Sequence, residues 1–280
     1  MTVVVVTDTS CRLPADLREQ WSIRQVPLHI LLDGLDLRDG VDEIPDDIHK
    51  RHATTAGATP VELSAAYQRA LADSGGDGVV AVHISSALSG TFRAAALTPA
   101  GLRPALWGIH SRSAALGARF AGLAAGRGAA ARGWRGKGGP APGRGGSPRA
   151  RVPRCGGLDN LRRSGRISGA KAWLGTALAL KPLLSVDDGK LVLVQRVRTV
   201  SNATAVMIDR VCQLVGDRPA ALAVHHVADP AAANDVAAAL AERLPACEPA
   251  MVTAMGPVLA LHVGAGAVGV CVDVGASPPA

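Results

Sequence analysis

The chain has 280 residues, of which 48% are hydrophobic and only 2% aromatic, and its formal net charge is +7. This length and hydrophobic content suffice for two packed domains, which excludes a disordered or fibrous chain. The five cysteines are scattered and contain no C-x-x-C pair, which excludes a disulfide scaffold and a cysteine-based zinc site.

Strand and helix patterns alternate over the first part of the chain. Short apolar runs bounded by turn residues predict buried strands, and helical spacing separates them. The predicted strands are 2–8, 23–34, 78–86 and 104–111, and the predicted helices are 13–21, 44–52, 59–75 and a short one within 87–97. This alternation predicts an α/β class with a Rossmann-like, doubly wound parallel sheet, whose ligands lie beyond the carboxyl ends of the strands.

Polar loops follow three of these strands, at 7–10, 85–90 and 110–113. The second loop offers several hydroxyls where a strand passes into a helix, and such groups suit an anion such as a carboxylate or phosphate. Helix capping explains the same residues equally well. No G-x-S-x-G elbow or identifiable base supports a serine nucleophile. The residues of interest in these loops are Asp8, Ser10, Ser85, Ser86, Ser89 and Thr91.

A Gly-, Arg- and Pro-rich segment at 126–157 interrupts the pattern. It holds eleven glycines, seven arginines and four prolines, with no hydrophobic period, and predicts no core element. A disordered basic tether for nucleic acid or an acidic partner is one explanation, and an ordinary flexible insertion is another. We favour a third, a compensated frameshift, because GC-rich coding DNA translated in a wrong frame gives this mixture of residues. The basic net charge then says little about function, since the stretch from Gly78 to Leu158 has twelve basic residues and no acidic one.

The second half has a different pattern, which predicts a separate α+β domain at 158–280 after an N-terminal domain at 1–157. Residues 190–200 alternate between apolar and polar side chains, and residues 219–228 have the composition of a strand. Residues 230–244 predict a helix, and two apolar strands follow it. No run reaches about 20 apolar residues and no signal peptide is apparent. We therefore expect a cytoplasmic protein without stable membrane insertion.

Two further motifs in this half have simpler explanations than cofactor or metal binding. "GAGAVG" at 264–269 matches the dinucleotide fingerprint, but it precedes a strand and leaves too little chain for the ribose-binding acid, so a glycine-rich turn is favoured. His225 and His226 lack ligands at metal spacing and are predicted to end a strand. His262 lies between two glycine-containing turns, where a hydrogen bond to a ligand is plausible on chemical grounds.

The assembled motifs resemble the DegV family of bacterial fatty acid-binding proteins. They occur in order as "VTDTSCRLP", "VPLHILLDG", "RDGVDEIPDDI", "TAGATPVEL", "HISSALSGTF", "SGRIS", "LKPLLSVDDGKL" and "GPVLALHVGAGAVG". The resemblance covers nearly everything except residues 124–156. Eight modest motifs in the family order are together highly specific. The family often has Thr-Ser-Gln-Pro where this chain has "TAGA" at residues 55–58. Thr55 is kept, but the residues that support it differ.

The resemblance implies a lipid-binding protein that is not an enzyme. A long-chain fatty acid would lie in a tunnel between the two domains, with its carboxylate bound by Thr55, Ser89 and His262. Asp8, Ser10, Ser85 and Ser86 would be nearby loop residues. No cofactor or metal is implied beyond the bound fatty acid.

The resemblance also implies a partner, an ATP-dependent fatty acid kinase that converts the bound acid to an acyl phosphate. Arg166 and Arg198 would dock this kinase. One alternative is a small hydrolase or acyltransferase that uses Ser89 with His262. A second alternative is a basic nucleic-acid-binding protein that works through 126–157, although nucleic acid is not the expected partner.

Overall fold

A computed structural model describes residues 3–98, 106–110, 149–154, 160, 165–166 and 181–274. The described residues form two compact units. The first contains the residues up to Glu43 and those from Thr54 to His110, and the second contains Ile44–Ala53 and everything from Arg149 onward. The predicted loop at 111–113 and most of the 126–157 segment lie outside the described residues.

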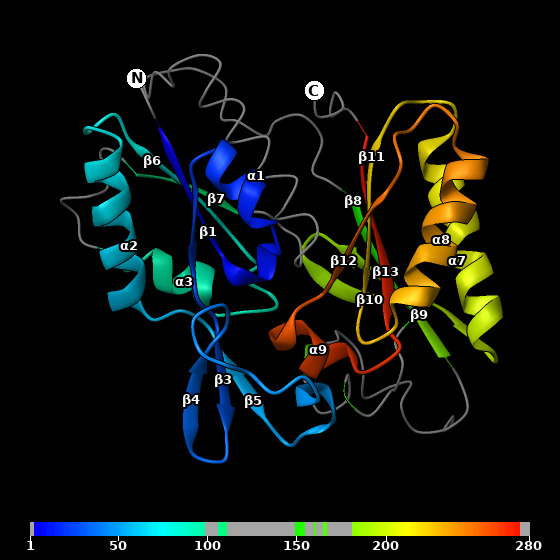
Figure 1. Cartoon of the computed structure of the whole chain (residues 1–280), viewed down its shortest axis with the longest axis horizontal. Helices are drawn as coiled ribbons and strands as arrows, with labels where there is room; N and C mark the ends of the chain where they lie inside the picture. Colours follow the sequence, from blue (N-terminus) through cyan, green and yellow to red (C-terminus); the bar gives the residue numbers. More distant parts are fainter. Residues whose placement is uncertain are drawn as a thin grey trace. The chain divides into compact units, whose positions relative to one another are not determined.

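The first unit is built on a four-stranded parallel sheet in the order β2-β1-β6-β7. Its strands are β1 (Val4–Asp8), β2 (Ile23–Val26), β6 (Val79–His83) and β7 (Leu106–His110), and its helices are α1 (Ala15–Gln20), α2 (Pro60–Asp73) and α3 (Thr91–Ala95). Alternate valines of β1 enter two cores on opposite faces, one beside α1 and the other beside α2 and α3 (Figure 1). This doubly wound arrangement confirms the predicted α/β class.

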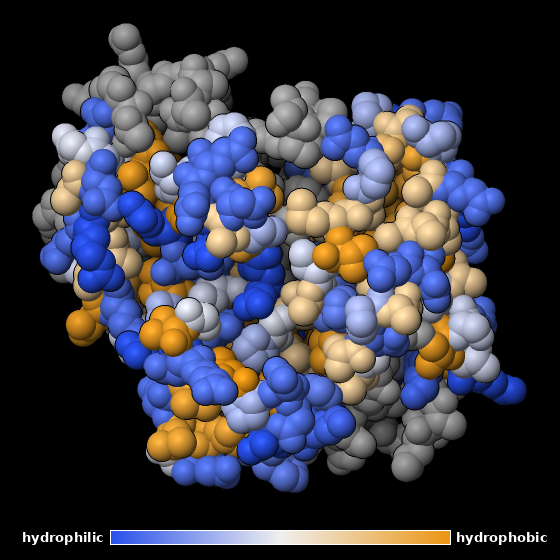
Figure 2. Space-filling model, viewed as in Figure 1, coloured by the Kyte–Doolittle hydropathy of each residue, from blue (hydrophilic) through white to orange (hydrophobic). Residues whose placement is uncertain are grey.

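A small antiparallel sheet extends the first unit, and we call it the three-stranded lobe. Its strands are β4 (Leu35–Arg38), β3 (His29–Leu32) and β5 (Thr54–Ala56) in that order. The prediction of one strand over 23–34 is wrong, because the chain leaves β2 at Pro27 and the Leu28 amide donates to Thr9 Oγ1 instead of a sheet partner. Leu31, Leu35 and Val41 are exposed in this part of the chain, and Figure 2 shows hydrophobic surface over the lobe.

The prediction of a helix over 44–52 is also wrong, since only one 3₁₀ turn forms there, η2 (Ile48–Lys50). Three successive short hydrogen-bonded turns around Pro45 and Asp47 replace the longer helix. This segment groups with the second unit, where η2 packs against α9 (Pro257–Val263), although its sequence position falls within the predicted N-terminal domain.

The second unit contains a six-stranded mixed sheet in the order β10-β9-β8-β13-β11-β12. Helices α7 (Val200–Val215) and α8 (Pro230–Arg243) pack along one face of it (Figure 1). The strands are β8 (Arg149–Arg154), β9 (Lys181–Asp187), β10 (Lys190–Val197), β11 (Ala221–His226), β12 (Met251–Ala254) and β13 (Val268–Asp273). Their apolar residues and those of the two helices form one core, as expected for an α+β unit. Helix α7 has no counterpart among the predicted elements.

β8 contradicts the prediction that the Gly-, Arg- and Pro-rich segment builds no core element. It lies inside the sheet, antiparallel to both β9 and β13. The ladder with β13 pairs Arg151 with Val270 and Arg154 with Val268, so two residues of β8 face one of β13 between these pairs. Pro153 falls in this β-bulge, where a residue without an N–H is tolerated. Pairing with β9 and β13 therefore makes a strand of residues whose local sequence pattern does not predict one.

Candidate functional site

A buried polar network joins the carboxyl ends of β1 and β6. Asp8 Oδ1 accepts hydrogen bonds from the Ser10 amide, 3.1 Å away, and from the Ser10 hydroxyl. Asp8 Oδ2 accepts from the Ile84 amide at 2.9 Å and lies 3.2 Å from His83 Nδ1. The carboxylate thus fixes the loop after β1 directly to the start of the loop after β6.

The network continues to helix α2 through His83. Its Nε2 lies 2.5 Å from the Tyr67 hydroxyl, and all of these side chains are buried. With Nδ1–H donated to Asp8, Nε2 is left to accept the Tyr67 proton. Burial raises the pKa of Tyr67, so the phenol stays protonated as this hydrogen bond requires. Asp8 and Ser10 were predicted as loop residues, whereas His83 and Tyr67 were not predicted, because their contact joins a strand end to a helix face 16 residues away.

The serine loop after β6 is a tight turn. The amides of Leu88 and Ser89 both donate to the Ser85 carbonyl, at 2.9 and 3.0 Å, and the Ala87 amide donates to Ser85 Oγ. Ser85 is fully buried and Ser89 partly exposed. Ser89 Oγ lies 2.9 Å from Thr91 Oγ1 and accepts from the Thr91 amide at 3.3 Å. Ser85 therefore shapes the loop, whereas Ser86 and Ser89 are both partly exposed.

Gly57 brings the strand that carries Thr55 against this hydroxyl pair. A Cβ at position 57 would lie 2.7 Å from Thr91 Oγ1, 3.0 Å from its amide nitrogen and 3.1 Å from Ser89 Oγ. Thr55 is two residues earlier on β5, so its Cα lies within about 7 Å of that of Gly57. The backbone two residues after Thr55 therefore lies against Ser89 and Thr91, although 34 positions separate Thr55 from Ser89 in the sequence.

His262 belongs to the second unit and lies near the end of α9. Gly256 (φ +81°) and Gly264 (φ +79°) bracket this helix with backbone conformations that L side chains rarely adopt. Asn160 Nδ2 donates to the Leu261 carbonyl at 3.3 Å and to the His49 carbonyl at 3.4 Å. These contacts fix the turn of backbone that presents His262.

The electrostatic surroundings of His262 keep its imidazole neutral. Burial lowers its pKa to about 4, and the positive charge of Arg166 adds to the decrease. At neutral pH the ring consequently has one N–H donor and one acceptor. Arg166 therefore lies within electrostatic range of His262, and a cation beside a neutral hydrogen-bonding imidazole is a suitable environment for an anion.

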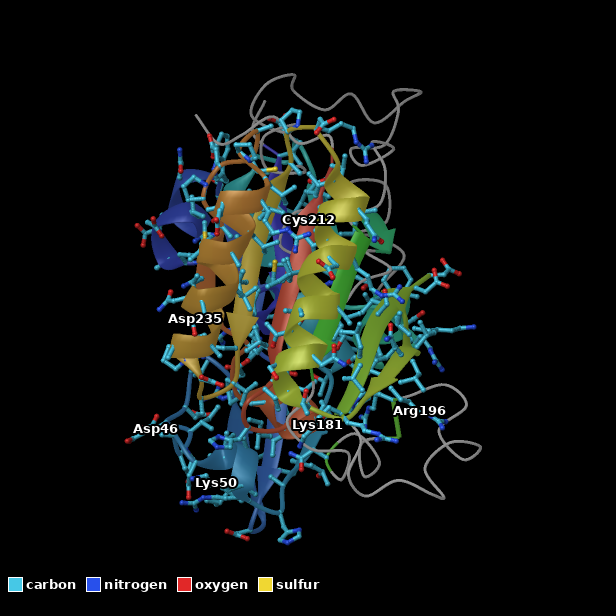
Figure 3. The ribbon with its side chains drawn as sticks, turned by 90° about the vertical axis from the view of Figure 1, so that its right-hand side faces the viewer. Asp46, Lys50, Lys181, Arg196, Cys212 and Asp235 are labelled. Carbon is cyan, nitrogen blue, oxygen red and sulfur yellow. The ribbon has the colours of Figure 1, made fainter. Side chains whose placement is uncertain are left out.

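Three basic residues lie at one end of the β9–β10 hairpin. The register pairs Lys181 with Val197 and Arg196 with Pro182, so both cations lie at the same end as Arg198, and Figure 3 shows Lys181 and Arg196. Arg196 and Arg198 are exposed.

The remaining motifs take the structural roles that were favoured for them. Residues 264–267 form a turn before β13, and His225 and His226 end β11. Within the part of the chain that the structure describes, no group of three or more His, Cys, Asp or Glu side chains is arranged to hold a metal ion. None of the described helices is long and apolar enough to cross a membrane.

Comparison with known families finds one that matches most of the chain. The model for uncharacterised proteins of the DegV family matches residues 2–133 and 155–274. A DegV domain-containing protein of Mycobacterium tuberculosis is 87% identical over the whole of both chains. Another, from Streptomyces coelicolor, is 34% identical over 97% of this chain and 98% of its own.

Solved structures of similar fold include two described as fatty acid-binding. A DegV family protein from Thermus thermophilus, described by its fatty acid binding, is 27% identical with a TM-score of 0.80, covering 98% of this chain and all of its own. DegV from Bacillus subtilis, described as a fatty acid-binding protein, is 25% identical with a TM-score of 0.83, covering 98% of this chain and 99% of its own. The two-unit architecture is therefore shared along essentially the whole chain.

Proposed function

The chain belongs to the DegV family, and we propose on this premise that it binds a long-chain fatty acid as a carrier and not as an enzyme. The observation that carries the proposal is the whole-length likeness to two solved proteins described as fatty acid-binding. The chemistry of the site agrees with it. A buried carboxylate needs close donors, and the proposed donors are the hydroxyls of Thr55 and Ser89 with the imidazole of His262.

Native mass spectrometry of the purified protein tests the carrier function. After expression in a lipid-containing host, we expect one fatty acid per chain, released and identified by organic extraction. Ser89→Ala should lower the loaded fraction, whereas Ser201→Ala, at an exposed serine of α7, should not. Folded wild-type protein that contains no fatty acid and binds none when it is added would contradict the proposal.

We further propose that the loaded protein presents the carboxylate to a separate ATP-dependent fatty acid kinase. The kinase would transfer the γ-phosphoryl group of ATP to a carboxylate oxygen, which gives an acyl phosphate and ADP. The exposed Arg198, beside Arg196, and Arg166, near His262, are the proposed docking residues.

Kinase turnover with the loaded carrier as substrate tests the docking residues. Arg198→Ala should raise the carrier concentration needed for half-maximal rate while fatty acid affinity stays unchanged. Lys190→Ala is the matched control, because Lys190 is an exposed cation at the opposite end of β10. An equal effect of both substitutions would exclude a specific docking role.

The hydrolase alternative would need His262, a residue of the second unit, as the base for Ser89. In the described part of its own unit, Ser89 Oγ bonds to Thr91 and to no histidine or carboxylate that could remove its proton. The absence of acyl-enzyme burst kinetics with an activated ester would separate the carrier from such an enzyme.

A further inference from the structure

We infer that Thr91 is a positioning residue that makes Ser89 an obligate hydrogen-bond donor and thereby selects an ionised carboxylate over neutral head groups. This inference rests on the proposed function and deepens it. It follows from the juxtaposition of the Ser89 hydroxyl, the buried Thr91 side chain and the backbone of Gly57.

The direction of the Ser89–Thr91 hydrogen bond follows from burial. Thr91 is fully buried, and among the described residues Ser89 Oγ is the one hydrogen-bond partner of Thr91 Oγ1, at 2.9 Å. If Ser89 donated its proton to Thr91, the Thr91 proton would have no acceptor, and a buried donor without a partner is costly. The Thr91 hydroxyl therefore donates and Ser89 Oγ accepts.

Ser89 Oγ then accepts twice, since the Thr91 amide donates to it as well, at 3.3 Å. A hydroxyl has two acceptor lone pairs and one proton, so both lone pairs are occupied. The remaining proton has to point away from Thr91, and Ser89 is partly exposed. A ligand there must accept this proton, which a carboxylate oxygen does well because it is ionised.

Gly57 closes the other side of the pair. A side chain at position 57 would meet Thr91 Oγ1 at 2.7 Å, so glycine lets the backbone cover Thr91 and keep water from its hydroxyl. Without water as an alternative acceptor, the Thr91 proton stays directed at Ser89. Its orientation is therefore fixed before any ligand arrives.

Two substitutions and two ligands test this inference. Thr91→Val keeps the shape and removes the hydroxyl, whereas Thr91→Ser keeps the hydroxyl. Oleate and oleyl alcohol share a tail, and an alcohol both donates and accepts, so it suits either orientation of Ser89. We expect Thr91→Val to weaken oleate binding about tenfold, the value of roughly one hydrogen bond, and oleyl alcohol binding less than twofold. Thr91→Ser, which keeps the hydroxyl, should bind oleate with the affinity of the wild-type protein.

The outcomes separate this inference from the proposed function. Wild-type protein that binds neither ligand contradicts the carrier function and, with it, the role of Thr91. Wild-type binding of oleate together with unchanged affinity in Thr91→Val contradicts the role of Thr91 alone. Equal losses for both ligands in Thr91→Val would show a general packing role and would also overturn the inference.

Discussion

At the scale of single residues, the site in the first unit depends on a close approach of backbone to side chain. Thr91 and Ser89 occupy the space that a side chain at position 57 would need. The atom nearest to such a Cβ, at 2.7 Å, is Thr91 Oγ1, which is hydrogen-bonded to Ser89 Oγ. Such a position tolerates no methyl group without movement of the hydroxyl pair.

Gly57→Ala should consequently lower both stability and fatty acid affinity. Overpacking costs about 1–3 kcal/mol of unfolding free energy, measured by urea denaturation, and the displaced Ser89 weakens binding. Gly90→Ala is the control, because Gly90 lies between the same two residues, has a right-handed φ of −70° and has open space where a Cβ would be. We expect that control to keep wild-type affinity, and equal losses in both variants would refute the role given to Gly57.

His262 provides a second test at this scale, through its protonation. Its pKa is lowered to about 4 by burial and by Arg166, so the ring is neutral in the folded protein at pH 7. A nearby ligand carboxylate favours the imidazolium, and fatty acid loading should raise this pKa. NMR titration of empty and loaded protein measures it, with His226, whose pKa burial also lowers, as the internal control. An identical His262 pKa in both states would place the carboxylate elsewhere.

The lowered pKa of His262 also determines how this residue makes the free energy of unfolding depend on pH. Between the ordinary pKa of 6.5 and the folded value of about 4, the unfolded chain binds a proton that the folded chain does not. Stability from His262 is therefore complete above pH 6.5 and is lost as the pH falls toward 4.

At the scale of elements, His29 ties the three-stranded lobe to helix α2. Its Nδ1 lies 2.7 Å from Asp36 of β4 and its Nε2 lies 3.0 Å from Glu62 of α2. A neutral imidazole has a single N–H, so donation to both carboxylates requires the imidazolium. Burial alone lowers the pKa of His29, but the hydrogen bonds to Asp36 and Glu62 outweigh it and raise the pKa above 6.5. The lobe includes Thr55, so this contact supports the candidate site.

Stability should depend on pH through this contact. The contribution of His29 is complete below pH 6.5 and is lost as the pH rises through its raised value. Glu62→Gln preserves the hydrogen bond to the Thr59 amide, removes the charge, and should lower the pKa of His29 and cost roughly 1–2 kcal/mol at pH 6. NMR titration and urea unfolding measure the two effects. Asp73→Asn, which removes only an exposed ion pair with Arg24, should change neither, and a His29 pKa unaltered by Glu62→Gln would contradict this account.

At the scale of the whole molecule, the second unit depends on a strand from the segment with the least orderly sequence. β8 separates β9 from β13, so both neighbours need its backbone hydrogen bonds. The gap in the family match, 134–154, falls within the same segment and is compatible with the frameshift hypothesis. Resequencing at nucleotide level tests that hypothesis.

Proline substitution tests whether β8 is an interior strand. Arg151→Pro removes an N–H where β8 is paired with Val270, and should lower the unfolding free energy of the second unit because an interior strand does not tolerate proline. Pro153→Ala is the control, because Pro153 lies in the bulge and its replacement should change little. Urea denaturation measures the unfolding free energy of both variants. An Arg151→Pro protein as stable as the wild type would mean that β8 is not an interior strand.

The family, the α/β class and the elements with local signals could be predicted from the amino-acid sequence alone. The short apolar runs of β1 and β6 and the Thr59–Glu62 capping box are each made by residues close together in the sequence. Local hydrophobicity and turn chemistry therefore predicted them. The loop hydroxyls after β6 followed from the same local pattern.

Contacts between residues far apart in the chain became visible in the folded structure. The separate lobe with Thr55, the approach of Gly57 to Ser89 and Thr91, and the partners of β8 all join residues far apart in the chain. A local pattern records which face of an element is apolar, but it does not record which hydrogen-bond partner lies opposite. For the same reason residues 44–53, part of the predicted N-terminal domain by position, pack with α9 of the second unit.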